Sequence, residues 1–264
     1  MGANSQTFAG RTAFVTGSTQ GLGAALLHQM ADLGLSTAIV TGRGVDRGQA
    51  VAAELQAKGC DASYIPVDLA NMDSVLELVD QVRERYGVVH HLANCAGITD
   101  RGDIWDTTPE LFERMMQINL HAPFFIIQGV ARMARDAGVP ASVVNVGSVS
   151  GHGGAPFITP YCISKGALMT MTKTLANQLM RDHIRVVGVN PGWMDTPAED
   201  MIQRKYHNAP DNWLELAAAT RPFGRLIQPE ELARTIAFVL SDEAGMMTGS
   251  IIDYDQSVQG TSEN

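Results

Sequence analysis

Short apolar runs alternate with longer stretches of helical periodicity along the first half of the chain. Nearly every position of each run is apolar, which is typical of a strand buried on both faces of a parallel sheet. The stretches between them carry apolar side chains three and four residues apart, which is the spacing of an amphipathic helix. We predict strands at 12–16, 36–41, 62–67, 88–93, 142–146, 184–190 and 250–254, and helices that include 22–33 and 72–86.

This alternation predicts an α/β fold: a single doubly wound, Rossmann-type domain whose parallel seven-stranded sheet has helices on both faces. No linker rich in Pro, Ser or Gly interrupts it, so we expect one domain over residues 1–264. The rhythm breaks only at 192–225, a polar stretch that contains Trp193, Tyr206, His207 and Trp213. We predict a substrate lid there, and a surface excursion with its own small core is the alternative.

Composition and charge narrow the classes of function. The chain has 264 residues, 45% of them hydrophobic, and a formal net charge of -9, so no basic field favours nucleic acid as a partner. Its cysteines, Cys60, Cys95 and Cys162, lack metal-ligand spacing, and we expect free thiols in a reducing compartment and no metal site. The first residues lack a signal pattern and no apolar run reaches the roughly 18 residues of a membrane span, so we expect a cytoplasmic protein without a membrane partner.

A glycine-rich turn follows the first predicted strand, where residues 16–23 read TGSTQGLG and lead into a helix. Glycines let the backbone approach a pyrophosphate at the positive end of that helix, although a merely tight connection would also use them. Arg43 ends the second strand, where an NAD-binding chain typically carries an acidic residue. Its guanidinium could pair with a 2′-phosphate, so NADP is favoured over NAD, and the alternative is a solvated arginine in a turn.

Three side chains form a candidate catalytic group. Tyr161 and Lys165 are four residues apart at the start of a predicted helix, which places them on one face within about 6 Å. A nearby cation lowers the pKa of a phenol, so Tyr161 could exchange a proton with an alcohol or carbonyl oxygen. Ser148 follows the strand at 142–146, at the edge of the sheet where ligands bind. Each feature alone occurs by chance, and the inference depends on their conjunction.

These motifs together resemble the short-chain dehydrogenase/reductase family over nearly the whole chain. The family's TGxxxGxG, YxxxK and PG motifs are found at 16–23, 161–165 and 191–192. The resemblance implies that Tyr161 is the general acid/base, Ser148 orients the substrate oxygen, Lys165 tunes Tyr161 and binds the nicotinamide ribose, and Asn119 holds a water in the proton relay. The cofactor-binding residues that it implies are Gly17, Thr19, Gln20, Gly21, Leu22, Gly23, Arg43, Asp68, Leu69, Asn94, Ala96, Gly97, Tyr161, Lys165, Pro191, Gly192 and Thr196.

The sequence departs from the family pattern in three places. Ala93 replaces the first asparagine of the NNAG turn, and Gln20 replaces the basic residue that many NADP-using members carry in the glycine loop. Near the C-terminus, 255–257 reads Asp-Gln-Ser instead of Asp-Gly-Gly. Members of the family commonly form tetramers through this region, and we expect a homo-oligomer, a tetramer or a dimer.

The resemblance and the residues predict an NAD(P)-dependent oxidoreductase that interconverts an alcohol and a carbonyl on a small sugar, polyol or related hydroxylated molecule. Trp193 and Trp213 offer flat faces for sugar rings, and His152 and His207 could bind hydroxyls, although all four could serve packing instead. One alternative is a 3-oxoacyl-thioester reductase, with Arg132 and Arg135 as a basic patch for an acidic carrier protein. The other alternative is a non-catalytic dinucleotide-binding sensor, for which a tuned phenol has no use.

Overall fold

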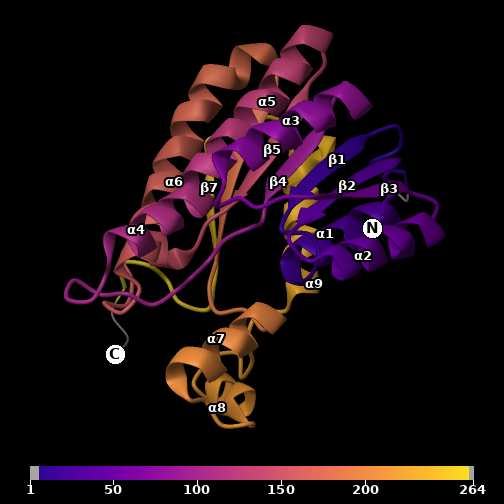
Figure 1. The fold of residues 1–264 in the computed structure, drawn as a ribbon. Helices are drawn as coiled ribbons and strands as arrows, with labels where there is room; N and C mark the ends of the chain where they lie inside the picture. Colours follow the sequence, from indigo (N-terminus) through magenta and orange to yellow (C-terminus); the bar gives the residue numbers. More distant parts are fainter. Residues whose placement is uncertain (1–5, 262–264) are drawn as a thin grey trace.

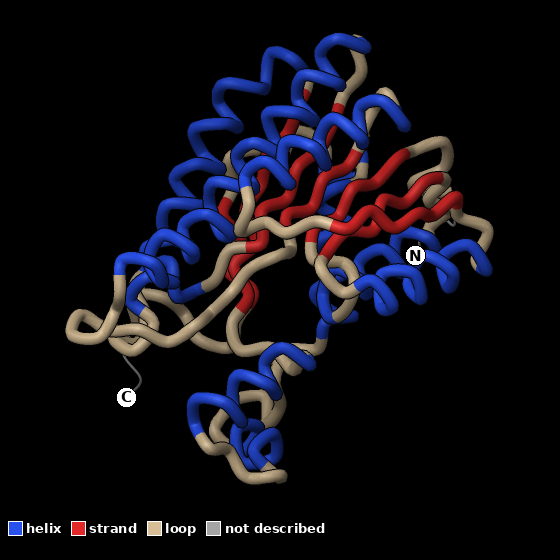
Figure 2. Tube along the Cα trace, viewed as in Figure 1, coloured by secondary structure: helices blue, strands red, loops and turns tan. Residues whose placement is uncertain are grey.

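The computed structural model describes residues 6–261, whose seven strands form one parallel sheet (Figure 2). The strand order is β3-β2-β1-β4-β5-β6-β7, which confirms the predicted doubly wound α/β fold. The strands are β1 (Thr12–Thr16), β2 (Thr37–Gly42), β3 (Asp61–Pro66), β4 (His91–Asn94), β5 (Ala141–Val146), β6 (Ile184–Pro191) and β7 (Ile251–Tyr254).

Helices cover both faces of the sheet, with α1, α2 and α9 on one face and α3, α5 and α6 on the other (Figure 1). Alternate strand residues face the two cores: Ala13 and Val15 pack against the first group, whereas Phe14 packs against the second. The helices are α1 (Gly21–Asp32), α2 (Val45–Ala57), α3 (Met72–Tyr86), α4 (Pro109–Met116), α5 (Ala122–Ala137), α6 (Thr159–Leu179), α7 (Pro197–His207), α8 (Trp213–Ala219) and α9 (Pro229–Leu240). None of the helices in the described part of the chain combines the length and apolarity needed to cross a membrane.

Helix α3 and strand β4 show where the sequence pattern was a good guide and where it was not. Helix α3 has the predicted bounds, because Asn71 caps its start by accepting hydrogen bonds from Asp73 N and Ser74 N, at 2.9 and 3.3 Å. Strand β4 begins three residues later than the predicted 88. The Val88 amide bonds to the carbonyl of Tyr86 within a turn, so the apolar character here reflects a buried connection and not a strand.

The chain reverses its winding direction between β1 and β4, which are neighbours in the sheet. In open α/β sheets a crevice forms at the carboxyl ends of the strands at such a point, and ligands bind in it. Helices α7 and α8, from the predicted lid, project from this edge (Figure 1). Trp213, Ala217 and Leu226 form a small core at this stretch, as the alternative interpretation expects, and residues 192–194, 196–199 and 202 of the same region also line the cleft described next.

Candidate active site

A cleft of about 390 Å³ lies along the carboxyl edge of the sheet, between the glycine turn and α7. It gathers residues that are far apart in the sequence, because the carboxyl ends of parallel strands meet at one edge. The predicted site residues in its wall are Gly17, Thr19, Gln20, Gly21, Leu22, Gly23, Arg43, Asp68, Leu69, Ala96, Gly97, Ser148, Tyr161, Lys165, Pro191, Gly192 and Thr196. Two predicted residues, Asn94 and Asn119, lie behind the wall.

The glycine turn is shaped for close approach of a ligand. Gly17 has φ +67°, and a Cβ at this position would lie 2.8 Å from the Cα of Ala96. Ser18 fixes the turn by donating to Val15 O at 2.6 Å and accepting from Thr41 N at 3.0 Å. Helix α1 begins directly after the turn with no side-chain cap at Gln20 and no acidic residue in its first turn. Its positive end therefore faces the cleft, which fits the pyrophosphate of a dinucleotide.

Two arginines lie where β2 reaches the cleft. Arg43 follows the strand as the sequence predicted, and Arg47 from the first turn of α2 lines the same wall. The Arg47 guanidinium packs over Gly44, where a Cβ would come within 2.9 Å of Nη2. The sequence motifs indicated Arg43 as a phosphate partner but did not indicate Arg47. The spacing of four residues across a helix start was the signal that could have identified it.

Tyr161, Ser148 and Lys165 meet at the centre of the cleft. Tyr161 is the third residue of α6, and its hydroxyl is hydrogen-bonded to the side chain of Ser148. The Lys165 ammonium donates to the Val146 carbonyl at 2.8 Å and lies 5.7 Å from the centroid of the Tyr161 ring. The Lys165 ammonium thus lies over the face of the phenol ring, while the Tyr161 hydroxyl is bonded to Ser148.

The pKa of Tyr161 corrects one expectation. Burial raises the pKa of the Tyr161 hydroxyl to about 12, although its hydrogen bond with Ser148 and the nearby Arg101 guanidinium both lower it. Burial also lowers the pKa of the Lys165 ammonium to about 8. The expectation that Lys165 makes this phenol acidic is therefore wrong for this structure, because desolvation outweighs the neighbouring charges and Lys165 is bonded to a backbone carbonyl.

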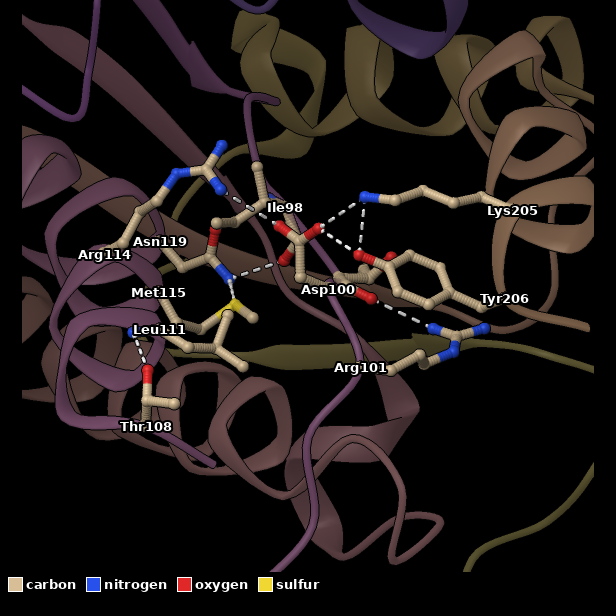
Figure 3. A network of polar contacts seen from close by, with 11 residues as sticks. Ile98, Asp100, Arg101, Thr108, Leu111, Arg114, Met115, Asn119, Lys205 and Tyr206 are labelled. Carbon is tan, nitrogen blue, oxygen red and sulfur yellow. Dashed lines mark hydrogen bonds and ion pairs between the residues drawn. The ribbon is translucent and has the colours of Figure 1, made fainter. Parts of the chain in front are cut away.

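Asn119 lies in a π-helical turn, Gln117–His121, between α4 and α5. Its side chain accepts from Ile98 N at 2.9 Å and donates to Ile98 O at 3.0 Å, which fixes the segment that follows β4 (Figure 3). It also donates to Ser164 Oγ at 3.1 Å, and so ties α6 to that segment. A Cβ on Gly97 would lie 3.4 Å from Asn119 Oδ1 and 3.5 Å from Lys165 Nζ, so these two side chains flank the same glycine. Single π-turns of this kind are frequent at functional sites.

Asn94 and Thr196 have structural contacts of their own. Asn94 is buried and donates to Asn145 Oδ1 at 2.9 Å, joining β4 to β5, while its own Oδ1 has no partner among the described residues. The Thr196 hydroxyl lines the cleft and caps α7 by accepting from Glu199 N at 3.1 Å.

Gln256, at one of the departures from the family pattern, accepts from Phe223 N at 2.9 Å and donates to Arg225 O at 2.6 Å. The C-terminal residues are thereby attached to the end of the lid stretch.

The residues proposed to hold a sugar have mixed environments. Trp213 is buried, stacks on Trp193 at 6.2 Å between centroids, and donates to Asp200 at 2.7 Å, so it is a packing residue. Trp193 lines the cleft, and its Nε1 donates to Glu199 Oε1 at 2.8 Å. His152 lies outside the cleft wall and contacts Asp253 at 2.9 Å.

His207 accepts hydrogen bonds from the Arg101 guanidinium and does not line the cleft. The sequence analysis missed both Arg101 and Glu199, because neither belongs to a motif.

Comparison with known proteins places this cleft in context. A protein-family model described as enoyl-(acyl carrier protein) reductase matches residues 17–258. The chain is 31% identical to a 3-oxoacyl-[acyl-carrier-protein] reductase of Thermotoga maritima, over 93% of this chain and 96% of that protein.

Two solved structures are similar over nearly their whole length. A gluconate 5-dehydrogenase from Burkholderia cenocepacia, in complex with NADP and tartrate, has a TM-score of 0.85 and 25% identity, covering 98% of this chain and 99% of its own. An NAD⁺-bound xylitol dehydrogenase has a TM-score of 0.86 and 25% identity, covering 95% and 99%.

Proposed function

The chain belongs to the short-chain dehydrogenase/reductase family and is an NAD(P)-dependent oxidoreductase, and we propose that it interconverts an alcohol and a carbonyl on a small sugar, polyol or related hydroxylated molecule. The observation that carries this proposal is the meeting of Tyr161, Ser148 and Lys165 in one cleft with the uncapped start of α1. A proton-exchanging hydroxyl and a dinucleotide site at the same sheet edge are what the reaction requires.

The residues of this chain divide the proton chemistry among them. Tyr161 is the general acid/base: with a pKa of about 12 it is protonated at neutral pH, so it is ready to give its proton to a carbonyl oxygen during reduction. Ser148, bonded to Tyr161, orients the same oxygen. Lys165 is fixed in the site by its hydrogen bond to the Val146 carbonyl. Asn119 fixes the backbone at Ile98 and holds the water of the proton relay beside Gly97. A bound nicotinamide supplies or accepts the hydride.

We propose NADP as the preferred cofactor. Arg43 and Arg47 both line the β2 end of the cleft, and paired guanidinium groups suit the 2′-phosphate that distinguishes NADP from NAD. Replacing Arg43 by Ser should lower kcat/KM with NADPH about 10- to 100-fold, the value of charged hydrogen bonds, and should leave kcat/KM with NADH nearly unchanged. An equal loss with both cofactors would remove Arg43 from cofactor discrimination.

The polyol class of substrate is supported by the names of the gluconate 5-dehydrogenase and the xylitol dehydrogenase. The name of the Thermotoga maritima relative favours a 3-oxoacyl-thioester reductase instead. For that alternative, Arg132 and Arg135 are the predicted basic patch that would bind an acidic carrier protein. Both are in the last two turns of α5, which leads into the amino end of β5, whereas the cleft opens at the carboxyl edge. A carrier bound there would dock at the wrong end of the sheet to deliver its thioester.

The direct test is a substrate panel with Tyr161→Phe as the reference variant. Wild-type enzyme is assayed with polyols, aldoses, ketones and a 3-oxoacyl thioester, each with NADP(H) and NAD(H). We expect turnover of the hydroxylated compounds, and a loss of about 10²- to 10⁴-fold in kcat for Tyr161→Phe with cofactor affinity unchanged. Turnover of long acyl thioesters alone would overturn the proposed substrate class, and full activity of the variant would overturn the role of Tyr161.

We also propose a cytoplasmic homo-oligomer, a tetramer or a dimer. The cysteines at 60, 95 and 162 are all free thiols, which suits a reducing compartment. Apolar side chains are exposed on three surface helices, at Phe124 of α5, Ile163 of α6 and Phe238 of α9. Exposed apolar groups of this kind are natural contacts between subunits, and the mass in solution at micromolar concentration tests the assembly.

A further inference from the structure

Arg101 is held in a fixed position beside the catalytic tyrosine. It follows β4 on the loop toward α4, and its guanidinium carbon lies 5.2 Å from the centroid of Phe157 and 5.8 Å from that of Tyr206. The guanidinium donates to the carbonyl of Thr99, a residue of the cleft wall, and its charge lowers the pKa of the Tyr161 hydroxyl. Burial lowers the pKa of Arg101 itself, so this cation is partly removed from water. A long flexible side chain packed between two rings has already lost the rotamer freedom that ligand binding would otherwise remove.

The guanidinium still has donors to spare. Its Nε and Nη2 donate to His207 Nε2 at 3.1 and 2.8 Å, and its Nη1 donates to Thr99 O at 3.0 Å. A guanidinium has five N–H groups, so within residues 6–261 one N–H on each terminal nitrogen is left without a hydrogen-bond partner. His207 acts as an acceptor and is therefore neutral in this contact, which adds no charge to the site. Two free N–H groups on one planar cation match the two oxygens of a carboxylate.

No carboxylate among residues 6–261 lies at ion-pair distance from Arg101. The adjacent Asp100 is already engaged: it accepts from the Tyr206 hydroxyl at 2.7 Å and lies 3.7 Å from Lys205 and 3.6 Å from Arg114 (Figure 3). Asp100 thus has two cations of its own. The charge of a partly buried arginine with no carboxylate at ion-pair distance is incompletely compensated, and such a group often marks the place of an anionic ligand.

Glu199, a carboxylate of the cleft wall, acts electrostatically on Arg101. Its Oε1 accepts from Trp193 and Gln203, at 2.8 and 2.7 Å, and the described residues leave its Oε2 without a hydrogen bond. Oε2 is therefore an acceptor available to a hydroxyl group of a ligand. Cation and acceptor together select a molecule that carries both an anionic group and hydroxyls.

We propose that the substrate is a hydroxylated carboxylic acid, whose carboxylate binds Arg101 and one of whose hydroxyls donates to Glu199. The inference rests on the proposed oxidoreductase function and specifies its substrate. In the oxidation direction the carbinol C–H bond would break with transfer of hydride to the bound cofactor, and the O–H proton would pass to the phenolate of Tyr161, which is the reverse of its proton donation during reduction. The product would be an oxo acid. The carboxylate itself is unchanged by the reaction and serves only to place the carbinol carbon.

The experiment compares three compounds with one carbon chain: neutral D-glucitol, D-gluconate and D-glucitol 6-phosphate. Each is assayed with NADP⁺ and wild-type, Arg101→Gln and Arg114→Gln enzyme. Arg114→Gln is the matched control. It also removes one positive charge, which lies 3.6 Å from Asp100, but it leaves the contacts of Arg101 with Phe157, Tyr206 and His207 intact. We expect Arg101→Gln to lower kcat/KM for D-gluconate, mainly through KM, about 10- to 100-fold more than it lowers kcat/KM for D-glucitol, because any effect on the pKa of Tyr161 acts on both compounds alike. Arg114→Gln should act weakly and only at low salt.

Binding without turnover separates this inference from the proposed function. D-gluconate is titrated into the enzyme–NADPH complex, which cannot oxidise it, and cofactor fluorescence reports the dissociation constant. Arg101→Gln should weaken this binding about as much as it raises KM, while Arg101→Lys, which keeps the charge, should recover part of it and confirm that the site still folds. Equal affinity of wild-type and Arg101→Gln enzyme for D-gluconate would overturn the inference even if polyols are oxidised.

Absence of turnover with all three compounds, together with Arg101-dependent binding, would instead overturn the proposed polyol reaction and support the anion site. Tighter binding of D-glucitol 6-phosphate than of D-gluconate, lost in Arg101→Gln, would overturn the carboxylate assignment in favour of a phosphate.

Discussion

Replacing Gly17 by Ala should damage the cofactor site by two separable effects. The first is the backbone: at φ +67° an L-residue costs about 1–2 kcal/mol. The second is the new Cβ, which would lie 2.8 Å from Ala96 Cα, 3.0 Å from its N and 3.1 Å from its Cβ. These are backbone neighbours that cannot rotate away, so the turn or the segment after β4 must shift, at a cost of roughly 1–3 kcal/mol by analogy with overpacked cores.

Gly10 provides a matched control. It has φ +72°, and a Cβ there would meet no atom of the described part of the chain within 4 Å. Gly10→Ala therefore carries the backbone cost alone, and any change in the unfolded chain is the same for both variants. Thermal unfolding and NADPH titration by fluorescence are measured on both. At about 2–4 °C per kcal/mol for a chain of this size class, we expect a Tm loss of roughly 5–10 °C for Gly17→Ala and about half of that for Gly10→Ala.

Cofactor affinity distinguishes the two variants most sharply. The shifted turn of Gly17→Ala misplaces the start of α1, so the dissociation constant for NADPH should rise about 10- to 100-fold, the loss of one or two charge-assisted hydrogen bonds. Gly10→Ala should bind NADPH as wild type does. If Gly17→Ala bound NADPH within twofold of wild type, close approach at this glycine would play no part in holding the dinucleotide.

Two further predictions concern stability. Asn71→Ala removes the cap of α3 and should cost about 1 kcal/mol of unfolding free energy in urea, and an unchanged midpoint would mean that water replaces the cap. Lys165 has a pKa of about 8 in the fold against 10.5 when unfolded, so between these values the unfolded chain binds more protons and stability rises with pH. Lys165→Met should remove this rise, which approaches 1.4 kcal/mol per pH unit at most, and the same pH profile for both proteins would refute the burial of that ammonium.

The sequence predicted the sheet because its signals are local. A run such as Ala141–Val146 is buried at every position, and only a central parallel strand gives that pattern. Several motif residues gather because they follow strand ends, so Ser148 could be placed at the edge of the sheet without coordinates. The spacing of four then placed Tyr161 and Lys165 on one face of the helix that follows. Arg101 could not be placed in this way. Its role depends on Phe157 and Tyr206, which are more than fifty residues away and belong to no shared pattern.

The protonation state of Tyr161 was out of reach of the sequence for a related physical reason. A spacing of four residues fixes the approximate distance between a phenol and an ammonium, but their pKa values depend on burial by the rest of the fold. Here burial raises the pKa of Tyr161 and lowers that of Lys165. Each buried polar group then needs a hydrogen-bond partner in place of the water that it has lost. For Lys165 that partner is the Val146 carbonyl, which no helical pattern could indicate.

Net charge is a poor guide to what this cleft binds. The chain carries -9 overall, yet Arg43 and Arg47 line the β2 end of the cleft and Arg101 donates to the carbonyl of Thr99 in the cleft wall. The acidic residues that contribute to this total include exposed ones on α3, where solvent and salt screen them. An arginine a few ångströms from a bound anion, at a site partly removed from water, attracts it more strongly than distant carboxylates, screened by solvent, repel it. The same local charges suit the proposed anionic cofactor and the proposed anionic substrate in one acidic protein.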